Sequence, residues 1–180
     1  MTGKMEELRL IADDLTGALD SGWAFAGRER PVLVALPGRP LPHGPCLAVS
    51  TETRNLSQRT AAKIVAGAVR RLKPAAGAGA LWFKKIDSVM RGHPFAETKA
   101  VLEAGGFSRC VFAPAFPEMG RVTTGGRQHL ATLDAAAFIP VGSAIVEAFQ
   151  MQGVCAEIVG SGDDRLPAAA RCPVLVVEAR

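Results

Sequence analysis

The sequence predicts an α/β fold with three layers, in which a mostly parallel, Rossmann-like sheet carries helices on both faces. Short apolar runs alternate with helical stretches from Leu8 to Ala113, and this alternation is typical of parallel sheets. The 180 residues are 48% hydrophobic and 21% charged, which is enough for one folded domain with a sizeable core.

Each expected element follows from its apolar pattern and its flanking turn residues. The expected strands are Leu8–Ala12, Pro31–Leu36, Cys46–Thr51, Ala80–Ile86, Arg109–Ala113, Val154–Val159 and Val174–Val177. The expected helices are Leu15–Ala26, a helix capped by Ser57 and ending near Leu72, Phe95–Ala104 before Gly105-Gly106, and Ala144–Met151. A long loop is expected over Pro114–Gly126, and Trp23, Phe25, Trp82 and Phe83 are expected to pack in the core or between helices.

Composition narrows the class of partner. The net charge is +4, aromatic residues make up 6% and there is no Tyr, so a stacking surface for nucleic-acid bases is poorly supported. The excess of Arg and Lys is more simply explained by the binding of a small anionic molecule. Cys46, Cys110, Cys155 and Cys172 are far apart, which argues against a zinc site or a disulfide framework and favours a reducing cytoplasm. No signal peptide or membrane span is expected.

Polar side chains gather where four of the predicted strands end. The segments are Asp13–Gly17, Thr51–Asn55, Lys84–Gly92 and Pro114–Gly126. Ligands of parallel sheets bind beyond the carboxyl ends of the strands, so these segments could converge on one pocket. They supply Asp13, Asp14, Glu52, Arg54, Lys85, Asp87, Ser88, Arg91 and Arg121. Arg can grip a carboxylate with two hydrogen bonds, and a carboxylate can accept a hydroxyl proton.

Each of these residues also has a purely structural interpretation. Asp14 or Thr16 could cap the following helix. Asp87 could cap the turn after its strand, with Arg91 as a surface ion pair worth little, and Arg121 could be a solvated loop residue. Several catalytic motifs are absent: the G-x-x-x-x-G-K-[ST] phosphate loop, a strand-linked G-x-G-x-x-G and the G-x-S-x-G of serine hydrolases. The adjacent acids Asp13-Asp14 also differ from the spaced pair of haloacid-dehalogenase-type phosphatases.

At these same segments the chain resembles the four-carbon acid sugar kinases, a family long known only as a domain of unknown function. The matching stretches, in family order, are Ile11–Ala18, Ser50–Asn55, Lys84–Gly92 and Ala113–Gly126. Two departures occur. Val89-Met90 stands where members usually have Thr-Leu, and Ser50 stands where many have Asp.

The resemblance implies a single sugar-acid-binding domain over residues 1–180, the N-terminal half of a two-domain kinase whose C-terminal nucleotide-binding domain is absent here. It implies Asp14 and Asp87 as the catalytic candidates that orient or deprotonate the acceptor hydroxyl. It also implies a set of substrate contacts: Asp13, Thr16, Arg54, Lys85, Ser88, Arg91, Gly92, Gly120 and Arg121. ATP and Mg are expected for the complete enzyme, with no metal ligand in this chain.

Two functions follow from this comparison. The first is the substrate-binding half of a threonate, erythronate or oxo-tetronate kinase, inactive alone and served by a separate nucleotide-binding domain or polypeptide. The second is a non-catalytic sugar-acid-binding or regulatory module derived from such a kinase. Self-association is an additional expectation, because a missing domain would leave apolar surface uncovered.

Overall fold

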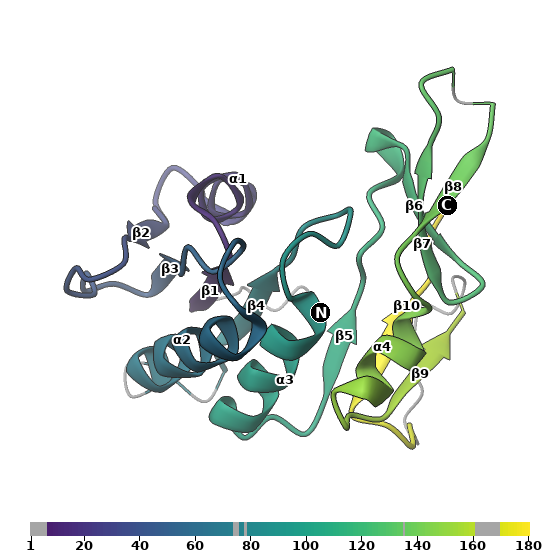
Figure 1. Ribbon diagram of the computed structural model, residues 1–180. Helices are drawn as coiled ribbons and strands as arrows, with labels where there is room; N and C mark the ends of the chain where they lie inside the picture. The colour runs from purple at the N-terminus through teal and green to yellow at the C-terminus, as the bar shows by residue number, and fades with distance from the viewer. Residues whose placement is uncertain (1–6, 74–75, 78, 135, 161–169) are drawn as a thin grey trace.

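Four parallel strands form the sheet that carries the predicted site, in the order β2-β3-β1-β4 (Figure 1). The computed structural model describes residues 7–73, 76–77, 79–134, 136–160 and 170–180. The strands of this sheet are β1 (Leu8–Ala12), β2 (Leu33–Ala35), β3 (Cys46–Ser50) and β4 (Leu81–Lys85). The central strand β1 pairs Leu8 with Cys46 of β3 and with Leu81 of β4. The predicted strands are therefore confirmed, with β2 shorter than expected.

Helices cover both faces of this sheet, as predicted (Figure 1). α1 (Leu15–Phe25) packs on the face to which Leu8 and Leu10 point. α2 (Gln58–Leu72) and α3 (Pro94–Gly105) cover the opposite face, to which Ile11 points. Alternate residues of a strand face opposite sides of a sheet, so β1, buried along its whole length, contributes to both layers of the core.

The strand expected over Arg109–Ala113 lies in a second parallel sheet. β5 (Cys110–Phe112), β10 (Val174–Val177) and β9 (Ala156–Val159) pair in the order β5-β10-β9. α4 (Ile145–Met151) and one side of α3 pack against them through an apolar cluster that includes Phe112 and Phe149. β5 belongs to this second sheet because its pairing partner is a strand some 60 residues later in the chain.

The expected loop Pro114–Gly126 contains a short 3-10 turn and one strand, and it leads into a third sheet. A 3-10 turn, η2 (Pro117–Met119), leads into the antiparallel strands β6 (Arg121–Thr124), β7 (Arg127–Ala131) and β8 (Phe138–Val141). This hairpin stands at the opposite end of the molecule from β2 (Figure 1). Its strands are short and partly polar, so their alternation is weak in the sequence. The turn glycines Gly125 and Gly126, both with positive φ, are the signal that could have indicated a hairpin.

Two smaller expectations are also wrong. Trp23 is not a core residue, since it is 83% exposed on the outer side of α1. Cys155 and Cys172 form a disulfide, because Cys155 precedes β9 and Cys172 precedes its neighbour β10, so a long sequence separation becomes adjacency in space. Among the described residues, no helix combines the length and apolar character needed to cross a membrane.

Candidate functional site

Three neighbouring strands of the first sheet deliver the charged residues of the site. Asp13 and Asp14 follow β1, Arg54 lies shortly after β3, and Asp87 lies shortly after β4. Because β1 is flanked by β3 and β4, the carboxyl ends of these strands lie at one edge of the sheet. The three segments therefore meet, as predicted.

The Arg54 guanidinium is the centre of this cluster. It donates to both carboxylate oxygens of Asp13, at 2.8 Å from Nε and 2.9 Å from Nη2, and its Nη1 donates to Asp14 Oδ2 at 2.5 Å. Its Nη2 also lies 3.9 Å from Asp87 Oδ1. This two-pronged geometry is the strong form of the Arg–carboxylate interaction. Asp13 raises the pKa of Arg54, chiefly by accepting its hydrogen bonds.

Asp14 has two structural roles at once. Its Oδ1 accepts from the backbone N–H of Gly17 at 2.8 Å, so Asp14 is the N-cap of α1, while Oδ2 faces Arg54. A side chain at position 17 would place its Cβ 2.6 Å from Asp14 Oδ1, which explains the glycine there. The cap interpretation of Asp14 is confirmed, and it coexists with membership of the charged cluster.

The loop after β4 folds around the carboxylate of Asp87. Oδ2 accepts from the backbone N–H groups of Val89 and Arg91, both at 3.1 Å, and the Arg91 guanidinium donates at 3.0 and 2.6 Å. To make this turn, Met90 adopts φ 63° and Gly92 φ 79°. A left-handed conformation is costly for a residue such as Met, and such strain tends to occur at functional sites.

The two charged residues of this loop differ in accessibility. Burial raises the pKa of Asp87, but the hydrogen bonds from Arg91 and Val89 outweigh it, so the pKa lies below its usual value of 3.8. The Arg91 side chain is 66% exposed and keeps guanidinium donors free for a ligand beyond the two that Asp87 occupies. Arg91 is therefore a tethered cation that faces solvent.

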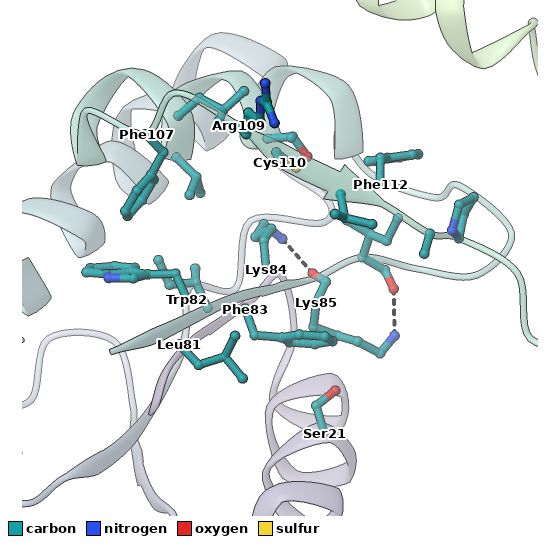
Figure 2. Close-up of a pocket in the computed structure, with 18 of the residues that line it drawn as sticks. Ser21, Leu81, Trp82, Phe83, Lys84, Lys85, Phe107, Arg109, Cys110 and Phe112 are labelled. Atoms are coloured by element: carbon teal, nitrogen blue, oxygen red, sulfur yellow. Dashed lines mark hydrogen bonds between the residues drawn. The ribbon is translucent and has the colours of Figure 1, made fainter. Parts of the chain in front are cut away.

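Lys85, at the end of β4, lies beside the cluster. Its Nζ donates to the carbonyl of Ile86 at 2.6 Å, and its stem packs against Gly17. Burial lowers the pKa of Lys85, while Asp13 and Asp87 act in the opposite direction. Lys85 and Ser88 also line a cleft of about 1060 Å³ between β4 and β5 (Figure 2).

A buried network of hydrogen bonds and one ion pair lies beside the charged cluster, and the sequence did not predict it. Glu97 of α3 is 1% exposed; it accepts from Thr53 Oγ1 at 2.7 Å and pairs with Lys84 Nζ at 2.8 Å. Thr53 also shares a hydrogen bond with Thr51. Thr53 precedes Arg54 directly, so this network fixes the backbone that presents Arg54. The sequence signal was an acid in the first turn of α3.

The fourth predicted segment does not join the cluster. Gly120 follows η2, and Arg121 is the first residue of β6, where its side chain donates to the carbonyl of Met119. Thr16 is exposed on α1. Within the part of the chain that the structure describes, none of the three contacts the charged cluster. The link to the hairpin is Gln128, fully buried, which donates to the carbonyls of Ser88 at 2.8 Å and Pro114 at 3.1 Å.

The charges and hydrogen bonds of the cluster bear on the kind of ligand that it could hold. The oxygens of Asp13, Asp14 and Asp87 already accept from guanidinium or backbone donors. No group of three or more His, Cys, Asp or Glu is arranged to hold a metal ion in the described ranges. The remaining donors of Arg91 and the Lys85 ammonium favour a carboxylate or phosphate.

Comparison with known proteins gives a consistent set of similarities. The family model described as "sugar-binding N-terminal domain" matches residues 8–147. A D-threonate kinase of Cupriavidus necator is 39% identical over 121 residues, which are 65% of this chain and 28% of the kinase. A D-erythronate kinase of Heliobacterium modesticaldum is 36% identical over 131 residues, 68% of this chain and 29% of the kinase.

A solved structure has the same fold. It is a Bordetella bronchiseptica protein, described as a domain of unknown function with bound citrate and as a domain-swapped dimer, and it is 29% identical to this chain. The TM-score is 0.72, and the match covers 96% of this chain and 47% of that protein. The chain thus spans under a third of the two kinases' length and about half of the solved protein.

Proposed function

The chain belongs to the family of sugar-binding N-terminal domains, and we propose that it is the substrate-binding half of an ATP-dependent four-carbon sugar-acid kinase. The observation that carries the proposal is the cluster of Arg54, Asp13, Asp14, Asp87 and Arg91 at adjoining strand ends. It combines cations for a carboxylate with acids for hydroxyl groups, and a sugar acid has both.

Accessibility separates the roles of these residues. The Asp13 and Asp87 side chains are only 4% and 7% exposed and hold the two guanidiniums, whereas Asp14 is 24% exposed. We therefore assign Asp14 the acceptor hydroxyl. It would take the hydroxyl proton as that oxygen bonds to the γ-phosphorus of ATP and the bond from phosphorus to the ADP oxygen breaks, so that ADP leaves. Arg91 and Lys85 bind the substrate carboxylate. Asp87 remains a catalytic candidate that acts by orienting Arg91.

The other predicted contacts have smaller roles in this proposal. Ser88 and Gly92 belong to the loop that presents Arg91, and a Cβ at Gly92 would lie 3.3 Å from Asp13 Oδ2. Thr16 lies in the exposed first turn of α1. For Gly120 and Arg121 to reach a ligand, the β6–β7 hairpin would have to close over the strand ends, and Gln128 provides its attachment.

ATP and Mg would supply the phosphoryl group, and the described residues do not fit them. The carboxylates that a Mg ion would require are engaged by Arg54 and Arg91. A second domain or polypeptide, as the greater length of the kinase relatives suggests, would therefore hold the nucleotide.

Thermal denaturation with D-threonate or D-erythronate tests substrate binding. At 100 times the dissociation constant a ligand adds about 2.7 kcal/mol of stability, which is a rise in Tm of about 5–10 °C for a domain of this size. The neutral polyols threitol and erythritol should give no shift, and Arg91→Gln should abolish the shift while Arg59→Gln, on the exposed face of α2, retains it. Equal shifts with acids and polyols would refute the proposal.

Turnover separates the kinase half from a non-catalytic module. In a complex with a nucleotide-binding domain, Asp14→Asn and Asp87→Asn should each reduce phosphorylation of the sugar acid strongly. Near-normal turnover in both variants would overturn the assigned roles. Binding of the sugar acid without phosphorylation in any such complex would instead favour the regulatory module.

A further inference from the structure

Two strand edges to which no described strand is paired face each other across the cleft of about 1060 Å³. β4 is the last strand of the first sheet and β5 the first strand of the second. The 1060 Å³ cleft is lined on one side by 81–86 and on the other by 109–116. Figure 2 shows the two strands on opposite walls, with Trp82 and Phe107 at one end and Lys85 at the other.

The pairing pattern identifies the backbone groups that face this cleft. The Leu81 N–H donates to Glu7 on the β1 side, and the Cys110 N–H donates to Pro173 on the β10 side. Successive residues of a strand direct their N–H and C=O groups to opposite edges. Trp82 and Lys84 of β4 and Val111 of β5 therefore present theirs to the cleft, where the described part of the chain offers them no backbone partner.

The two open strand edges point to a polypeptide segment as the occupant of the cleft. The cleft has a volume of about 1060 Å³ and a mostly apolar lining. An exposed apolar strand edge is a template for pairing with another strand. The outward backbone groups of Trp82, Lys84 and Val111 offer hydrogen bonds that an extended chain would match.

We propose that this cleft receives one extended apolar strand from the nucleotide-binding half of the kinase. That strand would pair with Trp82 and Lys84 on one edge and Val111 on the other, joining the two sheets into one by strand addition. The inference rests on the proposed function for the identity of the partner, and the relatives' additional length leaves room for it.

Hydrogen exchange on a reconstituted complex tests the inference. The probe is the part of the Bordetella bronchiseptica protein that this chain does not cover, co-expressed with the full 180-residue chain. In the complex the amides of Trp82, Lys84 and Val111 should exchange at least about tenfold more slowly than in the chain alone. The amides of β2, the other edge strand of the first sheet, serve as the internal control and should not change.

A matched pair of variants separates backbone pairing from side-chain contact. Val111→Pro removes the outward N–H, which the β5–β10 ladder does not use, so the chain should fold; the variant should weaken binding about tenfold or more. Val111→Ala keeps the N–H and should bind almost as the unaltered chain does. Absence of a complex, a complex without protection at these amides, or equal binding by Val111→Pro would overturn the inference.

The sugar-acid shift in Tm distinguishes failure of this inference from failure of the proposed function. If Val111→Pro and the unaltered chain both respond to D-threonate but the probe binds elsewhere or not at all, only the strand-docking inference fails. If the probe protects β4 and β5 while no sugar acid stabilises the chain, the docking surface stands and the proposed substrate class fails.

Discussion

Arg54→Gln is the most informative single substitution, because the Arg54 guanidinium lies within ion-pair distance of three carboxylates. Its removal leaves Asp13, only 4% exposed, and Asp14 without the guanidinium that pairs with them, and it takes a second cation away from Asp87. Breaking a buried ion pair from one side costs about 3–5 kcal/mol. Arg54 retains 18% exposure, so we expect the low end, about 3 kcal/mol, or a fall in Tm of about 6–12 °C.

Urea denaturation monitored by circular dichroism measures this loss, with Arg59→Gln as the control. Arg59 is exposed on α2, so the same change of charge should alter stability by less than about 0.5 kcal/mol. When Asp13→Asn is added to Arg54→Gln, the buried carboxylate that has lost its partner is removed. The double variant should therefore regain part of the lost free energy of unfolding, with a coupling energy of about 1–2 kcal/mol between the two sites. If Arg54→Gln were as stable as Arg59→Gln, Arg54 would not hold the strand ends together.

Two further predictions concern the surroundings of the cluster. Glu97→Gln should lower the free energy of unfolding by about 3–5 kcal/mol, because it leaves the buried Lys84 ammonium without its carboxylate. Urea denaturation measures this change. The control is Glu103→Gln on the same helix, which should show little change because the Glu103 side chain is 68% exposed. The pKa of Asp87 lies below 3.8 in the folded state, so its stabilising contribution is present above that pH and is lost as the pH falls through the folded value. The free energy of unfolding should therefore decrease between about pH 4 and pH 2, less steeply in Asp87→Asn than in Asp20→Asn, and identical slopes would contradict this assignment.

The local sequence predicted most of what depends on short-range pattern. The apolar run of β1, the Ser57 cap of α2 and the Gly106 stop of α3 each express a preference of neighbouring residues. The same holds for the candidate site: Asp13, Asp14 and Asp87 follow strands directly, so their convergence required only that β1 and β4 be parallel and adjacent. Arg54 lies a few residues past β3. The expectation that it reaches the same edge of the sheet likewise required only that β3 be parallel and adjacent to β1.

Long-range pairing decided what the sequence could not. β5 pairs with β10 and not with β4, and Cys155 forms a disulfide with Cys172. Strand pairing depends on packing between segments that are far apart in the chain, and the sequence of one segment does not identify its partner. Trp23 is exposed because residue type does not fix which side of α1 faces the sheet. Glu97 and Gln128 became recognisable as supports of the site only when burial and hydrogen-bond partners were known.

The sequence by itself determined the family, the order of the main elements and the charged residues at three strand ends, since these are local properties of the chain. Tertiary structure alone decided that Arg54 gathers the acids, that Asp14 is the most accessible of them, and that β4 and β5 leave a cleft between two sheets. Distances and exposure arise from the packing of all segments together, and no single segment encodes them.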